Sequence, residues 1–179
     1  MADSAAHSRR WTLRDWLQGR PLGHPTHAMF VHFPVAFYVG ALALDALSRL
    51  GRFPSAPLAA SWLLVGAFAG TALAAPTGFL DWLGMVPGSR KRRWATRHML
   101  AQLAALSIFV VDAVARWSSR GRARASLVWI GVELAGVLVL LLGQWLGGVL
   151  VYRLGMRVST GARPEHIAAT GAAESRRAS

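Results

Sequence analysis

The sequence predicts an all-α protein, an integral membrane bundle of four transmembrane helices. Its mean hydropathy is +0.36, and only 16% of its residues are charged, whereas about a quarter is usual for a soluble domain. The charged residues are concentrated between four long apolar stretches. Each stretch is close to the ~20 residues that an α-helix needs to cross a bilayer.

The four predicted spans follow one another along the 179 residues. They cover about residues 28–47, 57–83 (interrupted by Pro76 and Gly78), 98–114 and 127–151. Glycine and alanine recur at four-residue spacing in three of them, which favours close helix packing in lipid. The predicted domains are a basic amphipathic N-terminal arm at 1–22, a four-helix transmembrane domain at 23–155 and a disordered basic C-terminal tail at 156–179.

The distribution of basic residues predicts the orientation. The net charge of +12 could indicate nucleic-acid binding, but the Lys and Arg residues lie at the ends of the spans, so we exclude that class. The arm, the second connection and the tail carry 14 Lys and Arg residues, against 6 in the other two connections. By the positive-inside rule, both termini are expected in the cytoplasm.

Histidines mark the entrance to the first span and the start of the third. Pro34 is expected to break the first helix just after His32 and to turn that side chain into the bundle, where it faces His98. Two neutral imidazoles on facing helices can supply both axial ligands of a haem b. Arg97 and Arg153 would then pair with the haem propionates.

Two other interpretations of these histidines stay open. In a structural role, His32 and His98 hydrogen-bond Asp81 or backbone groups freed by Pro34. In a metal role, zinc or iron is bound by His27, His32, Asp81 and His98, although their spacing matches no standard motif. With haem, Asp81 would orient a ligating histidine through its second ring nitrogen. The chain has no cysteine, which excludes thiolate sites and disulfides.

A second polar layer is expected near the opposite membrane face, formed by Asp45, Asp112 and Glu133. The i,i+4 spacings of Asp45–Arg49 and Asp112–Arg116 predict ion pairs within single helices. Glu133 has no such partner in its own helix, and a proton relay through the three carboxyl groups is the alternative.

The stretch Gly23-His24-Pro25-Thr26-His27, followed by Val31-His32-Phe33-Pro34, resembles the opening of the bacterial membrane family called domain of unknown function 2231. The resemblance covers roughly residues 20 to 158. Further residues that match the family pattern are Asp45, 78–81, His98, 147–148 and 151–155. Ala28 and Leu154 depart from the pattern, since a proline and a histidine are expected there. The resemblance implies a four-helix inner-membrane protein, and an association with Rieske-type or other redox proteins implies electron transfer.

These observations give one leading hypothesis and two rivals. The chain is expected to bind haem b or a metal ion near the cytoplasmic face. It would pass electrons between a quinone or a cytoplasmic donor and a redox partner, such as a Rieske-like protein or a cytochrome. The rivals are a cofactor-free scaffold or assembly subunit, and a small proton or ion transporter. The sequence contains no nucleophile motif, so any catalysis would belong to a bound cofactor.

Overall fold

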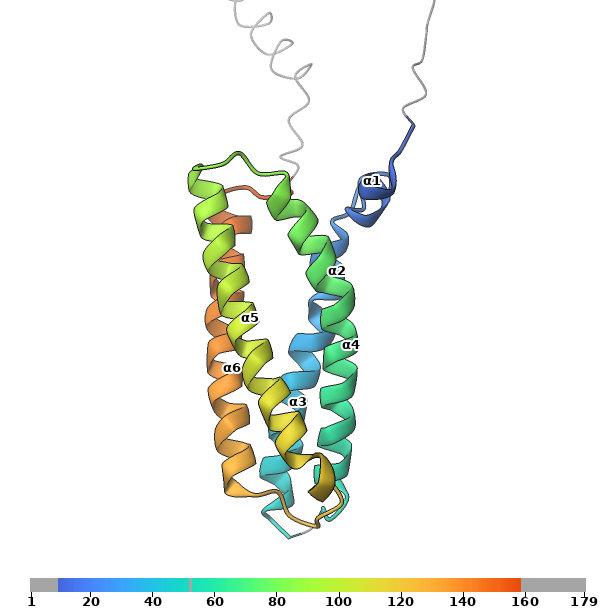
Figure 1. Ribbon diagram of the computed structural model, residues 1–179, viewed down its shortest axis with the longest axis vertical. Coiled ribbons are helices and arrows are strands. Elements are labelled where there is room, and N and C mark those ends of the chain that lie inside the picture. The colour runs from blue at the N-terminus through green and yellow to red at the C-terminus, as the bar shows by residue number, and fades with distance from the viewer. Residues whose placement is uncertain (1–9, 52, 159–179) are drawn as a thin grey trace, which may run out of the picture.

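A computed structural model of the protein describes residues 10–51 and 53–158. Its helices are α1 (Leu13–Leu17), α2 (Thr26–Phe30), α3 (His32–Ser48), α4 (Ala56–Leu83), α5 (Arg90–Arg116), η1 (Trp117–Ser119), α6 (Leu127–Gly148) and η2 (Val149–Arg153). Within the described residues there is no strand, and four helical spans are long and apolar enough to cross a membrane. The predicted all-α four-helix architecture is therefore confirmed (Figure 1).

The helix boundaries differ from the predicted ones in two places. Pro76 lies inside α4, which continues without interruption for 28 residues. A proline removes a single backbone donor, and a helix packed against its neighbours can tolerate that loss in a membrane. The helix α5 begins at Arg90 rather than near His98, because the Ser89 hydroxyl caps it by accepting a hydrogen bond from the Arg92 N–H at 3.1 Å.

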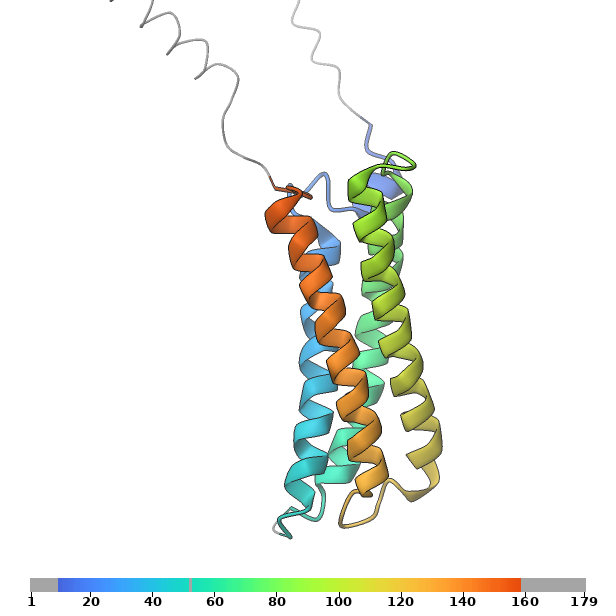
Figure 2. The ribbon, with the colours of Figure 1, turned by 90° about the vertical axis from the view of Figure 1, so that its left-hand side faces the viewer.

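The bundle consists of two helical hairpins (Figure 2). The first hairpin contains α3 packed along α4, and the second contains α5 packed along α6. Contact between α4 and α5 is sparse, and these helices diverge toward the end where α1 lies (Figure 1). We call this the histidine end, because His27 and His98 lie there, and the other the acidic end, after Asp45, Asp112 and Glu133.

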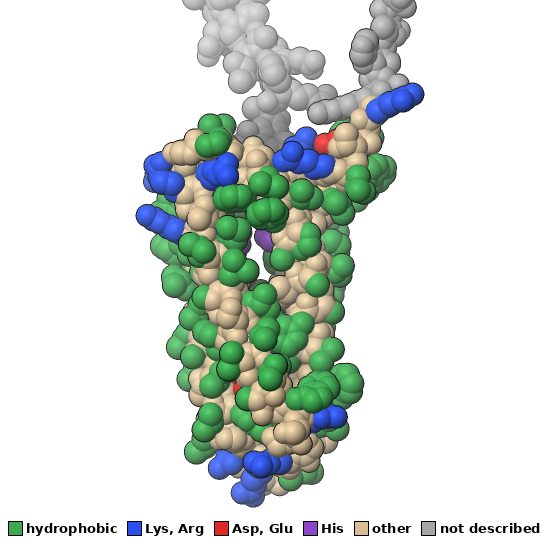
Figure 3. All heavy atoms as spheres, viewed as in Figure 1, with side chains coloured by type: hydrophobic (Ala, Val, Ile, Leu, Met, Phe, Trp, Pro, Cys, Tyr) green, Lys and Arg blue, Asp and Glu red, His purple; other side chains and the backbone are tan. Residues whose placement is uncertain are grey.

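Aromatic rings and glycines fill the middle of the bundle. Tyr38 of α3 stacks on Phe109 of α5, with ring centroids 4.0 Å apart. A Cβ atom on Gly136 of α6 would lie 2.9 Å from Phe109 Cζ, so the ring packs directly on the α6 backbone. Such close packing, rather than the hydrophobic effect, holds helices together in lipid. Apolar side chains cover much of the outer surface (Figure 3).

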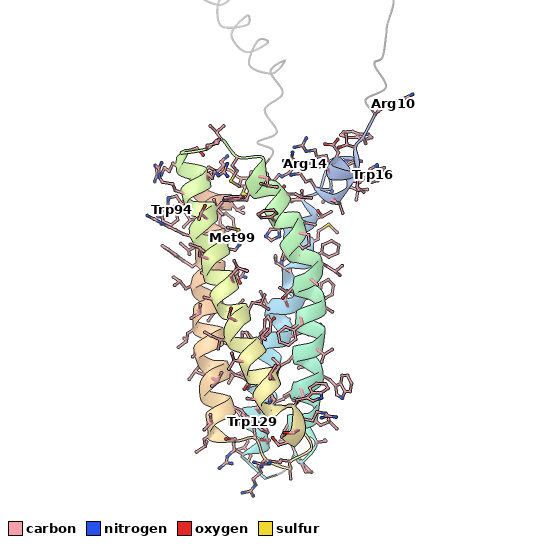
Figure 4. All side chains as sticks on the ribbon, viewed as in Figure 1. Arg10, Arg14, Trp16, Trp94, Met99 and Trp129 are labelled. Carbon is pink, nitrogen blue, oxygen red and sulfur yellow. The ribbon has the colours of Figure 1, made fainter. Side chains whose placement is uncertain are left out.

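Tryptophans lie at both ends of the bundle. Figure 4 shows Trp94 at the histidine end and Trp129 at the acidic end. Trp94 fits the interfacial position typical of membrane tryptophans, whereas Trp129 is buried. In the N-terminal arm, Leu13 and Trp16 of α1 are exposed, in keeping with a helix on the membrane surface. Residues 1–9 of the arm and 159–179 of the predicted tail lie outside the described residues.

Candidate functional site: a histidine pair and a buried charge cluster

His27 is fixed against α4. The helix α2 starts at Thr26, directly after Pro25, and the His27 Nδ1–H donates to the Ala74 carbonyl oxygen of α4 at 3.0 Å. A Cβ atom on Gly78 would lie 2.6 Å from His27 Cε1. Glycine at this position therefore makes room for the imidazole.

His98 is fixed against α6 in the same way. Its Nδ1–H donates to the Gly143 carbonyl oxygen of α6 at 2.7 Å. A Cβ atom on Gly147 would lie 3.2 Å from His98 Cε1. Each histidine thus packs on a glycine of the second helix in its own hairpin.

The two hairpins bring these rings together. The ring centroids of His27 and His98 are 6.3 Å apart, with an interplanar angle of 83°. A carbonyl oxygen can only accept a hydrogen bond, so Nδ1 carries the hydrogen and the neutral ring keeps a lone pair on Nε2. Figure 3 shows histidine side chains in a hollow between α4 and α5.

His32 does not take part in this pair. The His32 side chain is exposed, and its Nδ1 lies 3.4 Å from the Met29 carbonyl oxygen. The prediction that His32 faces His98 across the bundle is therefore wrong. Pro34 points at α4, where its Cδ would lie 2.9 Å from a Cβ on Gly70. His27 and Pro34 both face α4, whereas the His32 side chain is exposed.

A seven-residue spacing in the sequence identifies the inward-facing histidine. Residues seven apart lie on nearly the same face of a helix. The buried face of the first span carries a series of such residues, and the same spacing links residues of the third span. The two series are His27, Pro34, Ala41 and Ser48, and His98, Ala105 and Asp112.

Asp81 contacts residues near the beginning and near the end of the described structure. One of its oxygens, Oδ1, accepts a hydrogen bond from Gln18 Nε2 at 2.9 Å and also forms an ion pair with Arg157. Arg97, considered from the sequence as a partner of the haem propionates, is exposed and lies over the Trp94 ring at 5.4 Å. The described structure therefore places Asp81 in a structural contact between the N-terminal arm, α4 and the segment after η2.

The described residues contain no group of three or more His, Asp or Glu side chains that could hold a metal ion. The ion site predicted from the four residues His27, His32, Asp81 and His98 is not assembled there. His32 is exposed, and Asp81 is occupied by Gln18 and Arg157. Only His27 and His98 remain as a pair of nitrogen ligands.

A pocket of about 520 Å³ lies at the histidine end, between the N-terminal arm and the segment after η2. Arg20, His24 and Arg157 contribute its basic groups. Arg153, considered from the sequence as a partner for an acidic ligand, is exposed and does not line this pocket.

At the acidic end, Arg116 of α5 gathers carboxylates from three helices. Its Nη1 donates to Glu133 Oε1 of α6 at 2.8 Å and lies 3.4 Å from Asp112 Oδ2 of α5, while Nη2 pairs with Asp45 of α3. The guanidinium also lies over the Trp129 ring, at 4.6 Å. The side chains of Arg116, Asp45 and Glu133 are fully buried.

This cluster confirms one sequence-predicted ion pair and corrects another. Asp112 pairs with Arg116 as its spacing predicts, but Asp45 pairs with Arg116 rather than with Arg49. Arg49 donates instead to the Ala125 carbonyl oxygen at 3.1 Å. Asp45 and Arg116 are 71 residues apart in the sequence and belong to different helices, so local spacing could not predict their contact.

Comparison with protein families matches residues 23–160 to the family described as predicted membrane protein (DUF2231). No curated protein and no solved structure matches the chain. The matched region contains both members of the histidine pair, the whole charge cluster and all but the first residues of the described structure. Since the match extends over most of its length, the chain belongs to the DUF2231 family of predicted membrane proteins.

Proposed function

We propose that the protein binds haem b between His27 and His98 and serves in electron transfer within the membrane. The supporting observation is the histidine pair, in which both Nδ1 atoms hydrogen-bond backbone carbonyls and both Nε2 lone pairs are available. When bound, the haem supplies one-electron redox chemistry.

The spacing of the rings fits this ligand. Imidazole nitrogens lie about 2 Å from a bound metal, and the ring centre lies ~1 Å further away, so two imidazoles that hold one metal would have centroids about 6 Å apart. The observed separation is 6.3 Å. The Ala74 and Gly143 carbonyl oxygens fix the orientation of the rings, as partners of metal-bound histidines commonly do.

The acidic groups of the ligand would face the basic pocket at the histidine end. Arg157 and Arg20 line this pocket, and arginine pairs well with carboxylates. They replace Arg97 and Arg153 as the proposed partners of the propionates. Asp81 acts in this proposal by positioning Arg157 and not by contact with a ligating ring.

The proposed setting is the bacterial inner membrane, with the histidine end in the cytoplasm. The basic run at the start of α5, Arg90 to Arg97, lies at this end, as the positive-inside rule favours. A quinone or a Rieske-like or cytochrome protein would exchange electrons with the protein. The surrounding bilayer is the partner indicated most directly by the four apolar spans.

The test is an absorption spectrum of detergent-purified protein, expressed with added haem precursor, in the oxidised and dithionite-reduced forms. Wild-type protein is expected to show a Soret band and sharp α and β bands on reduction. His27→Ala and His98→Ala should each abolish this bis-histidine spectrum, and His32→Ala, as the matched control, should keep it. A colourless wild-type protein, or loss of the spectrum in the control alone, would contradict the proposal.

A further inference from the structure

The charge cluster at the acidic end contains more negative than positive groups. Three carboxyl groups, those of Asp45, Asp112 and Glu133, surround the single guanidinium of Arg116. If all were ionised, the cluster would carry a net charge of −2. Charges buried in a low-dielectric interior are strongly disfavoured unless they are compensated.

Among the described residues, Arg116 is the one basic side chain that forms an ion pair with these carboxyl groups. In the loop after η1, Arg120 lies over the Trp117 ring at 4.4 Å, and Arg124 lies beside Gly51. Asp81 is the only charged residue of α4, and it lies at the histidine end. Arg49, just beyond α3, points to the Ala125 carbonyl oxygen. From α6, Trp129 faces the guanidinium, and the Ser48 hydroxyl of α3 donates to the Asp45 carbonyl oxygen at 2.6 Å.

The hydrogen bonding of the cluster is incomplete: Arg116 Nε has no acceptor, and three carboxyl oxygens have no donor. One oxygen of each carboxyl group, namely Asp45 Oδ1, Asp112 Oδ1 and Glu133 Oε2, is buried and has no hydrogen-bond donor. The residues themselves are at most 2% exposed. A protonated carboxyl group is a donor as well as an acceptor, so protonation allows neighbouring carboxyl groups to bond to one another.

We propose that this cluster is a proton-binding site that holds two protons, one for each carboxyl group in excess of the guanidinium. The ligand is the proton, taken from water at the acidic end. A groove of about 410 Å³ lies beside Arg116 between α4 and α5, and apart from Ser61 and Arg116 its lining is apolar. The site is separate from the histidine pair and does not depend on haem binding.

Infrared spectroscopy tests this proposal, because the carbonyl stretch of a protonated carboxyl group is separate from that of a carboxylate and shifts on exchange into D₂O. The sample is the full chain in nanodiscs at neutral pH without added haem. With eight acidic residues in the chain, the buried groups are readily assigned by substitution.

Electroneutrality of the cluster predicts how many protonated carboxyl groups each variant holds, and therefore the intensity of their carbonyl band. Wild-type protein should show two protonated carboxyl groups, and Asp45→Asn, Asp112→Asn and Glu133→Gln should each show one. The double variant D112N/E133Q should show none, since one carboxylate then matches one guanidinium. Arg116→Gln should raise the intensity by about one half over wild type.

Asp81→Asn is the matched control, because Asp81 is buried but has its own arginine partner, Arg157. Its spectrum in this region should equal that of wild type. Should Arg116→Gln fail to fold, the three isosteric single variants still decide the question. A wild-type band no stronger than that of D112N/E133Q, or bound sodium or potassium in stoichiometric amount, would overturn the proposal.

Discussion

Gly78→Ala is the sharpest test of the histidine pair. The added Cβ would lie 2.6 Å from His27 Cε1 and 2.8 Å from His27 Nδ1. Carbon atoms in ordinary contact are about 3.5–4.0 Å apart, so the imidazole must retreat from α4 by about 1 Å. That movement breaks the 3.0 Å bond from Nδ1 to the Ala74 carbonyl oxygen, because hydrogen bonds weaken steeply beyond ~3.2 Å.

Loss of such an orienting partner typically lowers metal affinity by about 10–100-fold. We therefore expect the haem dissociation constant of Gly78→Ala to rise by about 10–100-fold, or ~1.4–2.8 kcal/mol. The assay is a titration of haem into detergent-solubilised apoprotein, followed by the Soret absorbance. Gly147→Ala should have a smaller effect, since its Cβ would lie 3.2 Å from His98 Cε1.

Gly131→Ala is the control, because a Cβ at Gly131 has nothing within 4 Å. It should bind haem like wild type. If Gly78→Ala bound haem as tightly as this control, while both folded normally, His27 would not be an axial ligand. The reasoning from the Gly78 contact would then fail.

Further perturbations test the rest of the fold. Arg116→Leu should lower the free energy of unfolding by about 3–5 kcal/mol, as measured by steric trapping in bicelles. An unchanged value would show that the cluster does not stabilise the fold. Asp81→Ala should speed tryptic cleavage after Arg14, because it releases the Gln18 contact that anchors the N-terminal arm; equal cleavage rates would argue against that anchor. Gly136→Ala should cost ~1–3 kcal/mol through overpacking, as its Cβ would lie 2.9 Å from the Phe109 ring; Gly131→Ala on the same helix should not.

The sequence was sufficient to predict the spans, because length and hydropathy alone determine which segments cross a bilayer. It was not sufficient to predict which histidine faces inward. The break between α2 and α3 lies at Val31, before His32, so Pro34 does not turn that side chain into the bundle.

The partner of Glu133 could not be predicted from its own helix, since Arg116 belongs to α5. Likewise, Arg157 reaches Asp81 across 76 residues. Contacts of this kind depend on how the hairpins dock, and local periodicity carries no information about that step.

The division into two hairpins has a consequence for assembly. The exposed turn of residues 84–89 separates a half that carries His27 and Asp45 from a half that carries His98 and Arg116. Neither half alone has both imidazoles, and Asp45 meets its guanidinium only across the interface. A chain severed at this turn would therefore regain the histidine pair and the complete cluster only when the two fragments recombine.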